Sequence, residues 1–221
     1  MNNKITLFTF SLLLLLTFTS FSQSKNSVGI TTGYNRGFGI NANFTIIDVA
    51  QGLPGNIRFS FGYNRLEPGN AGDARRIFIN NATNGVPQKK GKSFDYRIDY
   101  MMPHAFFKLK NSFLVFGPRY SSFTGNFNYV GGNENFDVTS KQWGLGIGAE
   151  NYFKMTSKFD LVLATGLDYY FNTTLKGHDT QYSPNNDNIN PRENYNYKDA
   201  NKAIKQPQFM PRIMVGVNLN L

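Results

Sequence analysis

The chain has 221 residues, including 21 Phe and 12 Tyr, and a formal net charge of +9. Only 17% of the residues are charged and cysteine is absent, which excludes disulfide frameworks, thiol catalysis and cysteine metal sites. The mean hydropathy is −0.38, and beyond the N-terminus no run approaches the roughly 20 apolar residues that a membrane-spanning helix needs. A helical membrane protein is therefore excluded.

Residues 1–22 have the features of a signal peptide. Lys4 supplies positive charge, Leu12 to Leu16 form the apolar centre, and small residues from Ser20 onward suit a cleavage site. A retained anchor helix is the alternative, but the apolar run is short and polar residues follow it at once. We expect an exported mature domain that comprises residues 23–221.

Eight segments of the mature domain alternate between two residue classes, which is the pattern of strands with unlike faces. The clearest is residues 159–171, where Leu161, Leu163 and Leu167 share one face while Asp160 and Gly166 lie on the other. This alternation predicts β-strands with one apolar face. In chain order the segments are residues 28–34, 40–46, 57–63, 94–108, 113–123, 143–154, 159–171 and 209–221.

The connections between these segments fall into two classes by length. Short turns alternate with long, polar loops, as in transmembrane barrels, where the turns lie in the periplasm and the loops outside the cell. The sequence therefore predicts an all-β fold, a transmembrane eight-stranded antiparallel up-and-down β-barrel. The short connections are residues 50–55, 109–112 and 155–158; the long ones are 65–93, 124–142 and 172–207, with 35–38 tight.

Part of the last long loop, Tyr182 to Tyr197, is rich in Asn and Pro, and we expect it to bury no core and to be mobile.

Aromatic residues cluster near both ends of the predicted strands. Such clustering predicts two girdles at the two membrane interfaces. We place Tyr34, Tyr63, Tyr96, Phe123, Trp143 and Tyr169 in the outer girdle, and Phe106, Phe113, Phe153 and Phe159 in the inner one.

The chain ends with Gly216, Leu219 and Leu221 in a pattern of alternating positions. This pattern resembles the terminal assembly signal of small eight-stranded outer-membrane barrels, the group that includes OmpX and the transmembrane domain of OmpA. The resemblance covers residues 27–221 and implies location in the cell outer membrane of a Gram-negative bacterium. It also implies recognition of the last strand by the barrel-assembly machinery. The chain departs from the pattern by ending in Leu rather than Phe and by having Met214 where a polar residue is common.

The polar faces of the strands carry as many basic as acidic side chains. An unpaired charge in a narrow lumen would be unstable, so we expect an interior charge network. Neighbouring strands should pair Asp168 with Arg212 and Asp160 with Lys154, in outer and inner layers that are each balanced. A water-filled lumen lined by unrelated charges is the alternative. The expected members are Arg58, Asp95, Arg97, Asp99, Arg119, Glu150, Lys154, Asp160, Asp168 and Arg212.

Basic residues also gather in the predicted loops and at their bases. They suit contact with the phosphate groups of lipopolysaccharide, and a solvated surface that keeps the loops soluble fits them equally. We expect outer-membrane lipid and lipopolysaccharide as partners, with a surface protein complex as a further candidate; no motif supports nucleic acid. The candidate contacts are Arg65, Arg75, Arg76, Lys89, Lys90, Lys92, Lys176 and Lys205.

Candidate chemistry is sparse. Gly144 to Ala149 matches a loose G-x-G-x-x-A pattern, but a dinucleotide site needs these glycines in a turn, whereas here they alternate within a strand. His104 has no partners for catalysis, and His178, Asp179 and Ser183 lie together in one loop, which preorganises them poorly. We expect neither an enzyme nor a bound cofactor or metal.

The fold class does not settle the function, because such barrels include anchors, adhesins, enzymes and subunits of surface complexes. We expect a structural, adhesive or partner-binding role through the long extracellular loops. The alternative is a narrow-pore or small-ligand transport protein. Eight strands enclose a lumen that side chains can fill, which argues against an open diffusion pore.

Overall fold

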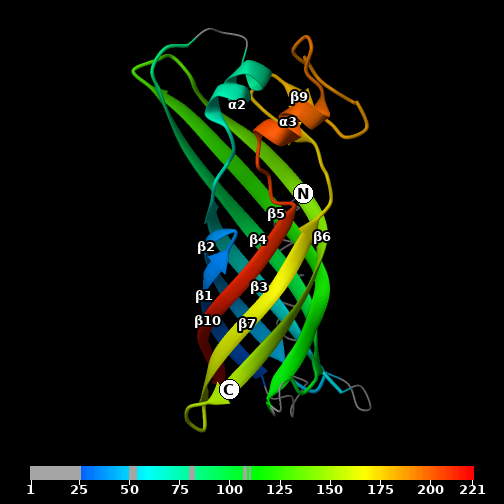
Figure 1. Cartoon of the computed structure of the whole chain (residues 1–221). Helices are drawn as coiled ribbons and strands as arrows, with labels where there is room; N and C mark the ends of the chain where they lie inside the picture. The colour runs from blue at the N-terminus through cyan, green and yellow to red at the C-terminus, as the bar shows by residue number, and fades with distance from the viewer. Residues whose placement is uncertain (1–25, 50–53, 80–82, 107–108, 110) are drawn as a thin grey trace, which may run out of the picture.

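A computed structural model describes residues 26–49, 54–79, 83–106, 109 and 111–221. The expected signal peptide and its cleavage site lie outside these residues. In the described part, eight antiparallel strands form a closed barrel, which confirms the predicted fold class (Figure 1). The barrel strands are β1 (Asn26–Asn35), β2 (Gly37–Ile46), β3 (Asn56–Leu66), β4 (Val86–Pro103), β5 (Ser112–Val130), β6 (Asn135–Lys154), β7 (Phe159–Tyr170) and β10 (Phe209–Asn220).

Each barrel strand pairs with the one before it along the chain, and the last strand pairs with the first. Ile30 of β1 lies opposite Ala42 of β2 on one side and opposite Val217 of β10 on the other. The sheet therefore closes on itself at membrane level, and backbone groups pair between neighbouring strands around the whole barrel, as hydrocarbon requires.

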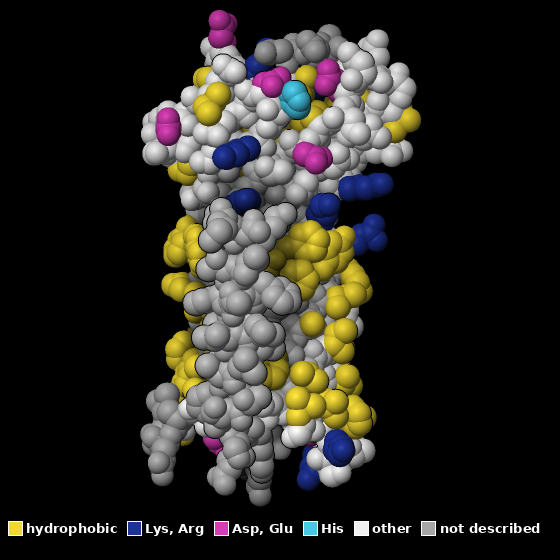
Figure 2. Space-filling view, turned by 180° about the vertical axis from the view of Figure 1, so that it is seen from behind, with side chains coloured by type: hydrophobic (Ala, Val, Ile, Leu, Met, Phe, Trp, Pro, Cys, Tyr) yellow, Lys and Arg dark blue, Asp and Glu magenta, His cyan; other side chains and the backbone are white. Residues whose placement is uncertain are grey.

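The alternating pattern points apolar side chains outward. Ile30, Leu145 and Ile213 are 51%, 59% and 61% exposed in the isolated chain. Figure 2 shows such side chains as a band around the middle of the molecule, with charged side chains above and below it. Soluble proteins rarely expose so much continuous apolar surface. The band is the lipid-facing surface of a membrane-spanning barrel.

Two aromatic residues that we expected in the girdles point inward instead of toward lipid. Phe123 is 0% exposed and belongs to a buried cluster outside the lipid band, and Phe113 stacks edge-on against Tyr152 at the inner end of the lumen. Both have odd numbers on β5, the parity that Arg119 shares, so they must point the same way as that lumen charge. Phe106 lies beyond the end of β4.

The barrel wall is much taller on one side than on the other. β4, β5 and β6 have 18, 19 and 20 residues, whereas β1 and β2 have 10 each. The expected long loop at residues 124–142 is therefore wrong, because β5 and β6 continue as a hairpin with its turn at residues 131–134. A membrane strand needs only about 9–11 residues, and the remaining length projects from the membrane.

The projecting wall supports a folded cap over the outer mouth of the barrel (Figure 1). The cap contains helices α2 (Ala71–Phe78) and α3 (Tyr197–Ala203) and the short strands β8 (Leu175–Lys176) and β9 (Gln181–Tyr182). No helix in the described part of the chain is long and apolar enough to span a membrane.

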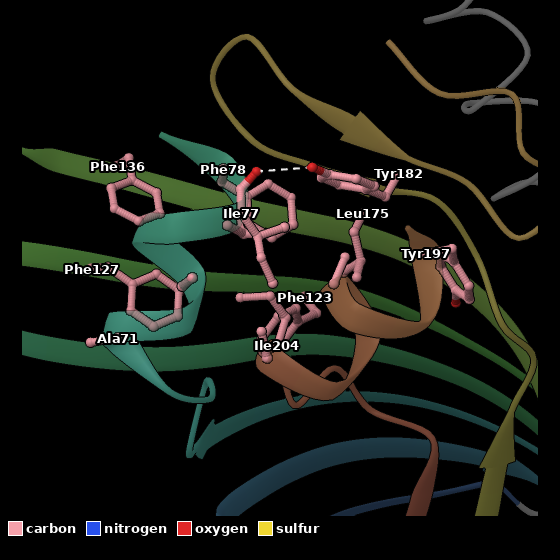
Figure 3. Packing of buried hydrophobic residues seen from close by; sticks show 14 of the residues in the cluster. Ala71, Ile77, Phe78, Phe123, Phe127, Phe136, Leu175, Tyr182, Tyr197 and Ile204 are labelled. Carbon is pink, nitrogen blue, oxygen red and sulfur yellow. Dashed lines mark hydrogen bonds between the residues drawn. The ribbon is translucent and has the colours of Figure 1, made fainter. Parts of the chain in front are cut away.

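A hydrophobic core holds the cap to the wall (Figure 3). Phe78 of α2 packs edge-on against Tyr182, whose hydroxyl donates a hydrogen bond to the Ile77 carbonyl at 3.0 Å. Phe123 and Phe127 of β5 enter the same core from the wall. The expectation that Tyr182 to Tyr197 buries no core is wrong at both ends of that segment, because both tyrosines are buried.

Side-chain caps explain why two such short helices form. Asn70 accepts a hydrogen bond from the Asp73 backbone N–H at 3.0 Å and so begins α2. Asn196 and Asp199 form a reciprocal capping box at the start of α3. The same Asn-rich composition that suggested disorder thus supplies the helix caps.

Candidate functional site

The lumen contains a network of four arginines and four carboxylates, all buried. Its members come from six strands: β3 (Arg58), β4 (Asp95, Arg97 and Asp99), β5 (Arg119), β6 (Glu150), β7 (Asp168) and β10 (Arg212). The numbers of positive and negative groups are equal, so the network as a whole is neutral. Neutrality is what allows so many charges to be withdrawn from water together.

Asp168 is the hub of the outer part of the network. Its Oδ1 accepts a hydrogen bond from Arg119 Nε at 2.8 Å, and its Oδ2 lies 3.3 Å from Arg212 Nη1 and 3.5 Å from Arg97 Nη2. One carboxylate thus serves three guanidinium groups. The pairing of Asp168 with Arg212 agrees with the expectation from the sequence, whereas the contacts with Arg97 and Arg119 were not anticipated.

Asp99 connects this outer part to the inner part. Its Oδ1 lies 2.7 Å from Arg119 Nη2, an ion pair without hydrogen-bond alignment, and its Oδ2 accepts from Arg58 Nη2 at 3.2 Å. Arg58 in turn binds Glu150 with both terminal nitrogens, at 2.5 and 2.7 Å. The expected division into two separately balanced layers is therefore wrong, because Asp99 joins them into one network.

Amide and hydroxyl groups complete the coordination of the carboxylates. Asp95 accepts from Ser121 at 2.7 Å and from Asn64 Nδ2 at 2.6 Å, and Asn64 Oδ1 accepts from Asn35 at 2.7 Å. Through these bonds the network reaches β1 and spans the width of the lumen. Such neutral donors stabilise a buried carboxylate without adding charge.

Glycines on β6 and β7 provide the space for the arginine side chains. A Cβ atom on Gly146 would lie 2.1 Å from Asp168 Oδ1 and 2.3 Å from Arg119 Nε. A Cβ on Gly166 would lie 2.8 Å from Arg212 Nε. The glycine run that resembles a dinucleotide motif is therefore part of a strand, and its small size lets Arg119 reach across β6 to Asp168.

Two of the expected members lie outside the network. Lys154 and Asp160 face each other in the register of β6 and β7, but they form no ion pair with each other in the described structure. Lys154 is exposed, and Asp160 is only half-buried and accepts a hydrogen bond from Asn220 at 2.8 Å. Both lie at the inner mouth, where bulk water solvates a charge and removes the need for a partner.

The eight loop cations separate into two groups by their partners. Lys89 pairs with Glu67 and Arg76 pairs with Asp73, and Arg75 also has interactions within the protein. Arg65, Lys90, Lys92, Lys176 and Lys205 are exposed, and no ion pair joins them to any acid in the described ranges. The expected cation set thus contains both structural and unpaired side chains.

The candidate catalytic trio does not assemble. His178 lies 2.9 Å from Asp179, and this hydrogen bond raises the pKa of the exposed histidine above its ordinary value. The Ser183 hydroxyl instead contacts Asn185 at 2.5 Å and Thr174 at 3.1 Å. The histidine and the serine are thus engaged with different neighbours.

His104 lies just beyond β4, exposed, with its ring against Phe106. Among the described residues, no group of three or more His, Asp or Glu side chains is placed to hold a metal ion.

Comparison with known proteins gives the fold an independent test. No family model matches the chain, and no curated protein matches it. Among solved structures, a major outer membrane protein from Thermus thermophilus is similar, with a TM-score of 0.72 and 22% identity over 90% of this chain and 100% of that one. The chain has the fold of a small outer-membrane β-barrel.

Two further solved structures match more distantly. Neisserial surface protein A (NspA) matches with a TM-score of 0.39 and 12% identity over 90% of this chain and 96% of its own. CarO of Acinetobacter baumannii also matches with a TM-score of 0.39 and 12% identity, over 89% of this chain and 97% of its own. The lipid-facing band of this barrel and the fold that it shares with the Thermus thermophilus outer membrane protein are consistent with location in the cell outer membrane.

Proposed function

We propose that this outer-membrane barrel displays its cap as a binding surface at the cell exterior and does not act as an open pore. The observation that carries the proposal is the filled lumen. Arg119 and Asp168 are 0% exposed at the level where β5, β6 and β7 run side by side. A solute entering from either end would have to separate these buried ion pairs.

The shape of the exterior supports a binding role. The wall formed by β4, β5 and β6 carries the cap away from the membrane, while on the other side β1 and β2 are joined through the single residue Arg36. Val86, Val130 and Ile189 are 71%, 46% and 54% exposed at this end, outside the lipid band. Val86 and Val130 are register partners and form a small exposed apolar patch of the kind that a protein partner covers.

The display of the cap can be tested with single cysteines, since the native chain has none. Cysteine at Asn84 or Asn133 should react with a membrane-impermeant maleimide on intact cells, because both positions are exposed at the cap end. Cysteine at Thr156, in the turn between β6 and β7, should react only after the outer membrane is permeabilised. Labelling at Thr156 on intact cells would reverse the orientation and remove the cap from the exterior.

Closure of the lumen can be tested in planar bilayers. The unmodified protein should show little steady conductance, and replacement of both Arg119 and Arg212 by Ala should raise it by opening space around Asp168. The matched control replaces Lys198 and Lys202 of α3, which removes the same charge from the exposed side of the cap. A large, stable conductance from the unmodified protein would defeat the closed-barrel proposal and favour the transport alternative.

A further inference from the structure

Three unpaired cations lie together on the outer wall, directly above the lipid band. Arg65 of β3 and Lys92 of β4 are register partners, and Lys90 is two residues farther along β4 on the same outward face. They border a hollow of about 290 Å³ whose lining also includes Tyr63, Thr124, Asn126 and Asp137. We call these cations and the residues around the hollow the wall site.

The wall site is a cluster of three cations that form no ion pair in the described structure, although Asp137 lines the same hollow. Lys89, the sequence neighbour of Lys90, points to the other side of the strand, where it pairs with Glu67 and donates to the Gly69 carbonyl at 2.9 Å. Arg65, Lys90 and Lys92 form no such bond within the described residues. Three like charges side by side on a sheet repel one another, so an anion would stabilise them.

The height of the wall site fixes what kind of anion can reach it. Along β3, Tyr63 is two residues nearer the membrane centre than Arg65, and along β4, Phe94 is two residues nearer than Lys92. The centroids of these two rings are 5.4 Å apart, and both rings face outward in the lipid band. Two residues of strand span about 7 Å. The cations therefore lie about 7 Å farther from the membrane centre than these two rings, where lipid headgroups begin.

The same arrangement recurs on β6, where the sequence analysis missed it. Lys141 is exposed and lies two residues beyond Trp143, the aromatic residue at the outer end of the lipid band on that strand. Its position had been assigned to a long loop, although the alternation that orients Trp143 also orients Lys141. An aromatic residue with a cation two positions farther from the membrane is thus the sequence pattern that indicates a cation at the level of the lipid headgroups.

Two further polar side chains, Asn126 and the acid Asp137, lie beside Lys90 at the same level of the wall. Asn126 is the register partner of Lys90, and its Nδ2 donates to Asn135 at 2.9 Å and to Asp137 at 2.7 Å. Amide and carboxylate groups on an exposed strand face suit the hydroxyl groups of a sugar, which both donate and accept hydrogen bonds. From the membrane outward the wall thus presents aromatic rings and then the cations, with Asn126 and Asp137 level with the outermost cation, Lys90.

We propose that the wall site binds the headgroup of an outer-leaflet glycolipid that carries phosphate on its sugar. In this arrangement the acyl chains lie against Tyr63 and Phe94, the phosphate lies between Arg65, Lys90 and Lys92, and the sugar faces Asn126 and Asp137. Lipid phosphate attracts cations at this depth. The aromatic rings below the cations suit the acyl chains, and Asn126 and Asp137 beside Lys90 offer hydrogen-bond partners to a sugar attached to the phosphate.

Purified protein in detergent micelles, titrated with a bis-phosphorylated acyl-glucosamine disaccharide and followed by native mass spectrometry, tests the proposal. The R65Q/K90Q/K92Q variant should bind on the order of 100-fold more weakly, about fivefold for each cation. The control K158Q/K198Q/K202Q removes the same charge from the periplasmic turn and from α3 and should bind as the unmodified protein does. Equal binding by both variants would overturn the proposal.

Further arms identify the source of the phosphate. Excess inorganic phosphate and phosphatidylglycerol should compete poorly, and the dephosphorylated disaccharide lipid should bind no better to the unmodified protein than to R65Q/K90Q/K92Q. An N126L variant should lose affinity for the glycolipid and keep what affinity it has for phosphatidylglycerol. If phosphatidylglycerol competes as well as the glycolipid, the site is a general phosphate site and the glycolipid proposal fails. These outcomes are independent of the conductance and labelling results, because they are measured on purified protein.

Discussion

Replacing Asp168 with Asn should lower the free energy of unfolding by about 3–5 kcal/mol, the usual effect of removing one partner from a buried ion pair. The change keeps the shape of the side chain and removes its charge. Arg97, Arg119 and Arg212 would then share a closed space with one carboxylate fewer. Since none of these arginines can release its proton or leave the lumen, their repulsion acts directly on the folded state.

Urea unfolding in lipid vesicles gives the measurement. The chain has one tryptophan, Trp143, which faces lipid in the barrel and would move into water on unfolding. Asp179→Asn is the control, because that carboxylate is 77% exposed on the cap and its loss should change little. An unfolding midpoint for Asp168→Asn within error of the control would mean that water already screens the network and that the lumen is wet.

Replacing Leu163 with Arg should destabilise the inserted barrel by about 2–4 kcal/mol, the range for a cation at the bilayer midplane. Leu163 lies near the middle of β7, opposite Val215 of β10, and is 40% exposed on the outward face. Its side chain contacts lipid, where a guanidinium group finds neither water nor a carboxylate.

The fraction of protein that folds into vesicles, read from the shifted gel mobility of the folded barrel, measures this effect. Asn133→Arg is the matched control, because it introduces the same group into an exposed turn outside the membrane. If both variants insert equally well, the apolar band does not lie in lipid and the protein is not membrane-spanning.

The strands could be predicted from the sequence because their signal is local. Each residue on a strand faces either lipid or lumen, and lipid tolerates only apolar side chains, so alternation survives along every strand. The same rule, applied strictly, would have placed Phe113 and Phe123 inside, since both share the parity of Arg119. Whether a residue number is odd or even decides which face of β5 a side chain lies on, whereas closeness to the strand end does not.

The network could be predicted in its members but not in its contacts. Asp168 and Arg212 lie on neighbouring strands, so their pairing follows from the order of strands along the chain. Arg58 and Glu150 lie on β3 and β6, which are not neighbours, and they meet only because the closed barrel brings opposite walls together. The contact of Arg119 with Asp168 likewise crosses β6 and depends on Gly146 having no side chain.

The cap could not be predicted because the signal for it is not local. β5 and β6 are longer than a strand needs to be to span a membrane. No local sequence pattern distinguishes the part of such a strand that continues into water from a polar loop. Phe127 and Phe136 on the wall belong to one buried cluster with residues of the helices α2 and α3, which are separated from them by many residues of chain. Only packing across that separation decides that these aromatic residues are buried.

The molecule therefore has two interiors of opposite character, one ionic in the barrel and one aromatic in the cap. The cap interior is held together by the release of water from apolar surface, so its cohesion weakens on cooling. The barrel interior adds ion pairs and hydrogen bonds to its buried apolar side chains, such as Met101 and Met214, and lipid rather than water surrounds it. The cap can accordingly open as a cooperative unit of its own while the barrel below stays closed, so a single unfolding free energy does not describe the whole chain.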